Sequence, residues 1–290
     1  MTVFTYNCPN QFLSEVEPFF LVNEALHNLP MGVAMSINHD ASALDIQPFL
    51  GHLSTRGIKR CILMRTKPSF WIMATNDELT ENEIEELVLY FKANNLPVGS
   101  VIGDPKNVER FAQRWCKELR ATSTIHMNQW VYVLNRVRQD LNRVDGELLK
   151  ATPAHSNLIK EWLVEFGDQA NEQIDHGTAQ YMAEKYVERE SVRLFHVGGE
   201  PVSMINQTRS TRNGCSVNGV FTPDKHKQNG YATASVTALS EEMLQGGYQF
   251  CCLYTDKDNI YSNRMYQNIG YEPIGESVVI RFDYEHVDKV

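Results

Sequence analysis

Residues 217–232 read Val-Asn-Gly-Val-Phe-Thr-Pro-Asp-Lys-His-Lys-Gln-Asn-Gly-Tyr-Ala, and this stretch decides the fold. Its first five residues, 217–221, include β-branched and aromatic side chains of the kind that strands favour. Pro223 cannot donate to a strand ladder, so it should end the strand, and the polar residues 224–229 are typical of a loop. The stretch therefore predicts a strand followed by a sharp loop.

A helix should follow this loop. Val236, Leu239 and Met243 recur at helical spacing, and the pattern runs from Ala232 to near Gly246 and Gly247. The first turn of such a helix leaves several backbone N–H groups without intrahelical partners and carries the positive end of the helix dipole. Because Gly230 has no Cβ, a phosphate could approach the backbone closely there. The strand, loop and helix start together indicate a pyrophosphate site.

The hexapeptide Lys227-Gln-Asn-Gly-Tyr-Ala232 resembles the acyl-coenzyme A signature of the GNAT superfamily of N-acetyltransferases, usually Arg/Gln-x-x-Gly-x-Gly/Ala. Lys227 stands where that family favours Arg or Gln. A short glycine pattern is also compatible with an ordinary turn between a strand and a helix. A second block is therefore needed to identify the fold.

That second block is Asn259-Ile-Tyr-Ser-Asn-Arg-Met-Tyr-Gln-Asn-Ile-Gly-Tyr271, which follows a predicted strand over Gln249–Thr255. It resembles the last conserved block of the family, Asn-x-x-Ala-x-x-Leu-Tyr-x-x-x-Gly-Phe, with substitutions that keep size and character. Gly270 is the expected left-handed end of this short helix. The two blocks, in the family's order, identify the fold as an α/β GNAT fold with a mixed, mainly antiparallel sheet and a splayed central strand pair.

The resemblance implies a site for acetyl-coenzyme A, a co-substrate, and no metal. The pantetheine arm would insert between the two splayed strands and pair with their backbone, a form of strand addition. The residues that the resemblance assigns to coenzyme binding are Val220, Thr222, Lys227, Gln228, Asn229, Gly230, Tyr231, Ala232, Asn259 and Asn263.

Tyr266 is the catalytic residue that the resemblance implies, as the acid that protonates the departing thiolate. The alternative is that Tyr266 only packs under the coenzyme. A general base remains open, because an alkylammonium has a pKa near ~10 and the site needs the free amine. Side chains that could line the acceptor side are Ser216, Asn218, Glu200, Tyr254 and Asp256, and a water chain could replace all of them.

Composition limits the partners. The chain has 290 residues and a formal charge of -9, with no dense basic run, which argues against a nucleic-acid partner. No apolar run approaches membrane length, and no basic-then-apolar leader is present at the N-terminus, so we expect a cytoplasmic protein with no membrane partner. The six cysteines show neither metal-ligand spacing nor a disulfide framework.

The chain is long enough for two domains. A polar stretch near 138–146 suggests a boundary, with a first domain over 1–140 and a catalytic GNAT domain over 146–290. The N-terminal half predicts helices near Phe12–Leu29 and Ala43–Leu53, strands at Lys59–Met64 and Phe70–Ala74, and further elements in the same order as the C-terminal half. We therefore expect a tandem of two α/β units, the first a degenerate GNAT-like or accessory domain.

The first unit differs from the second at the equivalent loop, residues 75–83. Thr80 and Glu83 have the spacing of a capping box, which would satisfy the helix start with its own side chains. The acidic residues of this loop would also repel a pyrophosphate, so we expect no coenzyme there.

We expect an N-acetyltransferase that transfers an acetyl group from acetyl-coenzyme A to a primary amine of a small molecule or peptide. Alternatives are an acyltransferase with another donor or acceptor and a non-catalytic acyl-coenzyme A binding or regulatory module. The protein could be a monomer or a homodimer.

Overall fold

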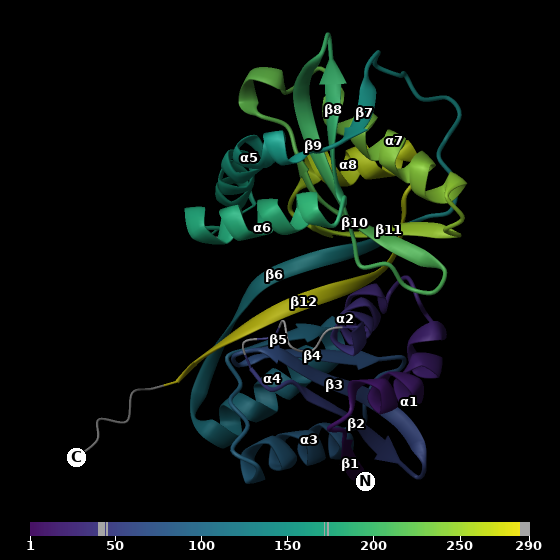
Figure 1. Ribbon diagram of the computed structural model, residues 1–290. Helices are drawn as coiled ribbons and strands as arrows, with labels where there is room; N and C mark the ends of the chain where they lie inside the picture. The colour runs from purple at the N-terminus through teal and green to yellow at the C-terminus, as the bar shows by residue number, and fades with distance from the viewer. Residues whose placement is uncertain (40–43, 45, 171, 173, 285–290) are drawn as a thin grey trace, which may run out of the picture. The chain divides into compact units, whose positions relative to one another are not determined.

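The computed structural model describes residues 1–39, 44, 46–170, 172 and 174–284 (Figure 1). The chain folds into two compact units. Unit 1 comprises Met1–Val131, Thr255–Asp258 and the described part of Ile274–Val290, and unit 2 comprises Tyr132–Tyr254 and Asn259–Pro273. This division differs from the sequence-based domains 1–140 and 146–290, because the end of the chain returns to unit 1.

Unit 2 contains the strand, loop and helix start on which the sequence analysis rests. Its strands lie in the order β11-β10-β9-β8-β7, with β10 and β11 parallel and the other neighbouring pairs antiparallel. Its elements are β7 (Glu147–Lys150), η2 (Pro153–His155), α5 (Ser156–Gln169), α6 (His176–Glu188), β8 (Val192–Val197), β9 (Glu200–Thr208), β10 (Gly214–Phe221), η3 (Asp224–His226), α7 (Tyr231–Gln245), β11 (Phe250–Asp256) and α8 (Ile260–Ile269).

Helices cover both faces of the unit 2 sheet. On one face α5 and α6 bury Trp162, Leu163 and Ala183 against Met204 and Phe221. On the other face α7 packs on β8, β9 and β10. Figure 1 shows α5 and α6 on one side of the green strands and α7 and α8 on the other. This is a three-layer α/β arrangement with one core on each face of the sheet.

Unit 1 repeats this order of elements, as the sequence predicted. Its strand order is β1-β2-β3-β4-β5-β12-β6. Its elements are β1 (Thr2–Thr5), α1 (Pro9–Leu21), α2 (Asn28–His39), β2 (Phe49–Thr55), β3 (Ile58–Lys67), β4 (Phe70–Thr75), α3 (Glu81–Ala93), β5 (Ser100–Gly103), α4 (Pro105–Leu119), β6 (Ala121–Leu134) and β12 (Glu272–Tyr284).

The helix expected over Ala43–Leu53 is wrong from Phe49 onward, because residues 49–55 form strand β2. Residues 40–43 and 45 lie outside the described part of the chain. Leu50 and Leu53 are three residues apart, a helical spacing, yet both are buried because the sheet around β2 is covered on both faces. A strand buried on both faces does not alternate, so its spacing can imitate a helix.

The last strand, β12, completes unit 1. It pairs antiparallel with β5, and its apolar residues Val278, Ile280 and Phe282 enter the unit 1 core. Conversely, the end of β6 belongs to unit 2, where the Tyr132 hydroxyl accepts a hydrogen bond from Gln267 Nε2 at 3.1 Å. Each half of the sequence therefore gives part of its final strand to the other unit.

No helix in the part of the chain that the structure describes combines the length and apolar character required to cross a membrane.

Candidate active site

The parallel strands β10 and β11 part after three residue pairs. Gly214, Cys215 and Ser216 pair with Phe250, Cys251 and Cys252, and the described register ends there. Strand β10 nevertheless continues to Phe221 and β11 to Asp256. Beyond Ser216 the backbone of β10 therefore has no described partner on β11, and an extended amide chain could add there as a strand.

A β-bulge interrupts the regular pairing of β10 with β9 in the part of β10 beyond Ser216. Asn218 pairs with Asn206 and Phe221 with Met204, so β10 has one residue more than β9 between these pairs. Gly219 in the bulge has φ +58°, a left-handed conformation that glycine adopts without steric strain. Val220, one of the predicted coenzyme contacts, lies in this bulge.

Thr222 follows β10 and is held by its side chain. Its hydroxyl donates to Ser203 Oγ at 3.0 Å, and the Ser203 hydroxyl donates to the Phe221 carbonyl at 2.9 Å. All three residues are buried. The Thr222 side chain is thus committed to the protein, which leaves only its backbone for the predicted contact with the coenzyme.

The N-terminus of α7 carries no side-chain cap among the described residues. Its N-cap is Gly230, with φ +79°, and the Gly230 carbonyl accepts the first helical hydrogen bond from Ala234 N at 2.9 Å. The amides of Tyr231 and Ala232 lie in the first turn, where the positive end of the helix dipole favours an anion. This is the helix start that the sequence predicted, and a pyrophosphate fits its chemistry.

The loop before α7 is ordered by its own hydrogen bonds. Asn229 Nδ2 donates to the carbonyls of His226 and Lys227 at 3.1 and 3.0 Å. Gln228 has φ +64°, a conformation uncommon outside glycine. Lys227 Nζ lies 2.7 Å from Asp224 Oδ1 and donates to Gln169 Oε1 at 3.0 Å. Since the charge of Lys227 is already paired, anion binding here depends chiefly on backbone amides.

The second sequence block forms α8 as expected. Asn259 caps the helix by accepting from Ser262 N at 3.0 Å, and Asn263 N donates to the Asn259 carbonyl at 3.0 Å. Gly270 ends the helix with φ +116°. Asn259 therefore has a structural role as a cap, while its contact with the coenzyme and that of Asn263 stay predictions.

Tyr266 projects from α8 into a buried cluster of tyrosines. Its ring centroid lies 5.8 Å from that of Tyr271 and 6.3 Å from that of Tyr132. Burial raises the pKa of Tyr266 above the ordinary tyrosine value. The phenol therefore keeps its proton at neutral pH, which suits a proton donor.

Tyr132 is a part of this cluster that the sequence analysis missed. It lies near the end of β6 and is 1% exposed. Its position in the N-terminal half gave no reason to join it to Tyr266, which is 134 positions later. The two rings lie together because the end of β6, which carries Tyr132, belongs to unit 2 together with Tyr266.

A polar network lies on the face of the sheet covered by α5 and α6. Asn206 Nδ2 donates to Asn218 Oδ1 at 2.8 Å, and the Ser191 hydroxyl donates to Asn206 Oδ1 at 2.7 Å. Tyr186, whose pKa burial raises, also bonds to the Asn218 side chain. Asn218 is among the residues predicted from the sequence to line the acceptor side and Asn206 is not, although a polar residue within the apolar strand 202–206 was an available signal.

Ser216 and Tyr254 flank the point where β10 and β11 part. Arg209 Nη2 donates to Ser216 Oγ at 3.0 Å, and the Arg209 guanidinium carbon lies 5.8 Å from the centroid of the Tyr254 ring. Glu200 is engaged elsewhere, 3.2 Å from Lys225 Nζ. Asp256 belongs to unit 1. Of the two carboxylates that could act as a general base, Glu200 therefore pairs with Lys225 and Asp256 belongs to unit 1. The described candidates in unit 2 thus offer no carboxylate for this role.

The described residues contain no group of three His, Cys, Asp or Glu side chains that could hold a metal ion. Cys215 and Cys251 face each other on β10 and β11 with 3.9 Å between their sulfurs, and both thiols are free and buried.

Comparison with known families gives one match in the C-terminal part of the chain. The family described as FR47-like protein matches residues 196–280, a range that contains both sequence blocks. No curated protein matches the chain.

Solved structures match almost the whole chain. An acetyltransferase of the GNAT family from Colwellia psychrerythraea aligns with 98% of this chain and 100% of its own, at 11% identity and a TM-score of 0.62. A GCN5-related N-acetyltransferase from Sphaerobacter thermophilus aligns with 96% of this chain and 95% of its own, at 12% identity and a TM-score of 0.62. A tandem GNAT protein from the clavulanic acid biosynthesis pathway aligns with 97% of this chain and 98% of its own, at 10% identity and a TM-score of 0.59. At these identities the likeness concerns the fold, and it confirms the predicted tandem of α/β units.

Proposed function

We propose that this chain, which has the tandem GNAT acetyltransferase fold with an FR47-like domain in its C-terminal part, is an N-acetyltransferase with one site for acetyl-coenzyme A. The observation that carries the proposal is the parting of β10 and β11 beside an uncapped helix N-terminus. One feature receives an amide chain and the other receives an anion, and acyl-coenzyme A contains both.

The coenzyme would be held mainly by backbone groups. Val220 and Thr222 offer the backbone that pairs with the amide arm, and Gly230, Tyr231 and Ala232 offer the first-turn amides for the pyrophosphate. The ordered loop at 227–229 keeps these amides in place through the side chain of Asn229. Lys227 adds a charge that Asp224 partly neutralises.

The reaction joins a neutral primary amine to the acetyl carbonyl carbon, with loss of the thiol. The new C–N bond forms as the C–S bond breaks, and Tyr266 donates its phenolic proton to the leaving sulfur. The amine nitrogen releases one proton to water, and the phenolate takes up one from solvent. Tyr266 is buried beside Tyr271 and Tyr132, and because burial raises its pKa the phenol still carries its proton when the thiolate forms.

The acceptor would enter from the face covered by α5 and α6. On this face the Asn218 side chain is hydrogen-bonded to Asn206, and the Ser216 side chain is hydrogen-bonded to Arg209. Neither Asn218 nor Ser216 carries a negative charge. We therefore assign them to positioning the amine and assign its deprotonation to water. The acceptor class is a small molecule or peptide with a primary amine.

Release of coenzyme A thiol from acetyl-coenzyme A, followed spectroscopically with a panel of primary amines, tests the proposal. We expect thiol release with at least one amine and no thiol release when the amine is omitted. Propionyl- and succinyl-coenzyme A in parallel would identify another acyl donor. Tight binding of acetyl-coenzyme A without turnover for any amine or donor would instead indicate a binding module and contradict the enzymatic proposal.

A further inference from the structure

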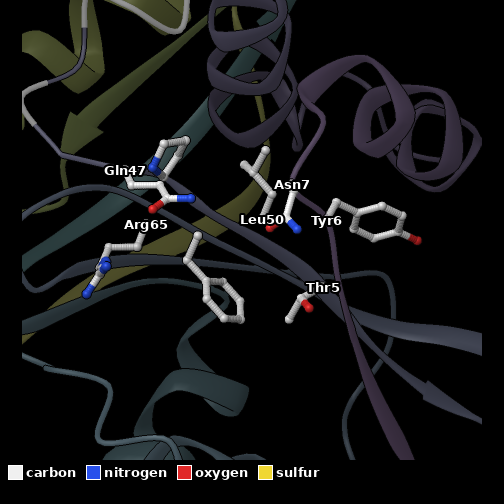
Figure 2. Close-up of a pocket in the computed structure, with 8 residues that line it drawn as sticks. Thr5, Tyr6, Asn7, Gln47, Leu50 and Arg65 are labelled. Carbon is white, nitrogen blue, oxygen red and sulfur yellow. The ribbon is translucent and has the colours of Figure 1, made fainter.

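Unit 1 contains a pocket of about 270 Å³ that the proposed transferase reaction does not use. It lies where β1 ends, β2 begins and β3 ends, and its lining includes Thr5, Asn7, Gln47, Phe49, Leu50 and Arg65. In Figure 2 Arg65 and Gln47 approach from one side, and Thr5 and Asn7 from the other. Strand β4 begins, at Phe70, beside the end of β3, whereas the slot equivalent to the coenzyme site lies at its other end, after Thr75.

Arg65 is the unusual member of this pocket. Its Nε is buried and has no hydrogen-bond partner within the described residues. Its guanidinium carbon lies 5.5 Å from the centroid of the Trp71 ring, and Trp71 also packs against Phe49 with 4.9 Å between ring centroids. The ring contact orients the guanidinium and leaves Nε without an acceptor. A buried donor without an acceptor is rare and destabilising, so it points to an acceptor supplied from outside the protein.

Arg114 Nε is also buried without a partner, but Arg114 Nη2 lies 2.5 Å from Glu85 Oε1, so within the described residues it is the lack of an ion pair that distinguishes Arg65. Arg60 donates to Glu83, Asp77 and the Glu78 carbonyl. Arg110 likewise contacts two carboxylates at 3.2 and 2.6 Å. In a chain with a formal charge of -9, acidic partners are abundant, yet the described residues give Arg65 no ion pair. Within the described part of the chain, its charge is therefore available to meet an anion in the pocket.

The remaining lining selects the class of anion. Gln47 and Asn7 carry neutral amide donors that can support an oxygen ligand, and Thr5 adds a hydroxyl. Phe49 and Leu50 add an apolar wall, which would be wasted on a fully hydrated inorganic ion. A guanidinium edge matches the two oxygens of a carboxylate. The geometry points to a binding site for a small organic monocarboxylate with an apolar body, held by Arg65.

Isothermal titration of the full-length protein with benzoate tests this inference, with benzamide as the neutral isostere and inorganic phosphate as the hydrated anion. We expect one benzoate per chain, at least tenfold weaker binding of benzamide, and no comparable binding of phosphate. Arg65→Gln should weaken benzoate binding at least tenfold. Arg56→Gln, which removes an equal charge from the exposed turn before β3, should leave it unchanged.

Equal binding of benzoate and benzamide, or unchanged binding by Arg65→Gln, would overturn the site. Phosphate binding as tightly as benzoate would overturn the ligand class. If Arg65→Gln does not fold, NMR of the arginine Nε–H signals in the wild-type protein decides. One signal should shift with benzoate but not with benzamide and should be missing from Arg65→Lys, and the absence of any such shift would contradict the inference. None of these measurements depends on transferase activity.

Discussion

The two parallel strand pairs whose registers the structure describes end differently. In unit 2, β10 and β11 pair over three residues and then part. In unit 1, β4 and β5 pair along the whole of β5, from Phe70 with Ser100 to Met73 with Gly103. A Cβ on Gly103 would lie 2.2 Å from the Met73 carbonyl oxygen, so these backbones are in close contact. The same order of elements thus yields an open strand pair in one unit and a closed one in the other.

The helices that follow these strands also begin differently. Helix α7 has Gly230 as an N-cap with no side-chain bond, whereas α3 has the capping box that the sequence predicted. Thr80 N donates to Glu83 Oε2 at 2.8 Å, and Glu83 N donates to Thr80 Oγ1 at 3.3 Å. Two amides at the start of α3 are therefore bonded inside the protein, whereas the described residues give the start of α7 no side-chain cap.

Asn107, on α4, hydrogen-bonds to the end of β4 and to the loop that follows it. This region of unit 1, residues 75–83, corresponds to the proposed coenzyme loop of unit 2. Asn107 accepts from Leu79 N at 2.8 Å and donates to Thr75 Oγ1 at 2.9 Å and to the Asp77 carbonyl at 3.2 Å. One buried amide thus joins the end of β4, the loop after it and α4. We therefore expect unit 1 to keep its architecture without a coenzyme, because its own side chains bond these backbone groups.

The acidic loop of unit 1 is neutralised more fully than the sequence suggested. Arg60 and Arg110 form ion pairs with Asp77, Glu78, Glu81 and Glu83. Repulsion of a pyrophosphate by acidic side chains therefore contributes less to the expected difference in coenzyme binding between the units. The hydrogen bonds that α3 and Asn107 make within unit 1 contribute more.

Ala232→Glu should produce the largest change, because it gives α7 an acidic first turn like that of α3. A carboxylate at this position would repel the pyrophosphate, and like charges brought together cost several kcal/mol, so coenzyme affinity should fall by roughly 100-fold or more. Helix stability should not fall, since an acidic residue is favourable at a helix N-terminus. Isothermal titration with coenzyme A and thermal unfolding measure the two quantities.

Gln245→Glu is the matched control, because it adds the same charge at the exposed last residue of α7. Its coenzyme affinity should stay within a factor of two or three of the wild-type value, as expected for a screened surface charge. Equal affinities of Ala232→Glu and Gln245→Glu would show that the α7 N-terminus does not bind the pyrophosphate.

Tyr266→Phe should lower turnover by about 10- to 100-fold through loss of the proton donor, while coenzyme affinity changes little. Steady-state thiol release and titration with coenzyme A separate the two effects. Tyr132→Phe is the control, since it removes the hydroxyl from a tyrosine of the same cluster that accepts from Gln267. If Tyr266→Phe turns over as fast as wild type, Tyr266 serves only to pack.

Glu83→Gln tests how much the hydrogen bonds of Glu83 at the start of α3 contribute to the free energy of unfolding. Burial alone would raise the pKa of Glu83, but bonds from Thr80, Thr55 and Arg60 outweigh it and lower the pKa. Loss of a buried charged acceptor should reduce the free energy of unfolding by about 1–3 kcal/mol in urea. Glu81→Gln, an exposed partner of Arg110, should cost only about 0–1 kcal/mol.

The pH dependence of this effect has a definite sign. Because the folded-state pKa of Glu83 is depressed, its stabilisation is full above the unfolded value of ~4.3 and is lost as pH falls through the folded value. The difference in unfolding free energy between wild type and Glu83→Gln should therefore shrink between about pH 5 and pH 3. A difference that stays constant or grows on acidification would contradict the assigned bonds.

Lys227→Gln should have the smallest effect. Its ammonium is already paired with Asp224, so coenzyme affinity should fall by less than about fivefold. Glutamine is also a residue that the family signature favours at this position. A loss as large as that of Ala232→Glu would mean that side-chain charge, and not backbone amides, binds the pyrophosphate.

Local chemistry explains what could be predicted from the sequence. Pro223, Gly230 and Gly270 act within a few residues of their own positions, so the strand end, the helix start and the helix stop followed from residue type. The capping box of α3 depends on two residues three apart and was equally readable.

What the sequence did not disclose depends on distant partners. Residues 49–53 carry a helix-like spacing but belong to strand β2, because neighbouring elements bury both faces of this strand. Tyr132 joins Tyr266, and Asn107 joins Thr75, only through the tertiary fold. The exchange of final strands between the units left no local signal, so contiguous domain boundaries could not describe it.

The number of coenzyme molecules bound per chain tests the central difference between the units most directly. Isothermal titration of the wild-type protein and Ala232→Glu with coenzyme A should give one site in the wild type and none, over the same concentration range, in the variant. Two sites in the wild type, or one undiminished site in Ala232→Glu, would contradict the account, because coenzyme would then bind where the structure closes the strand pair and caps the helix.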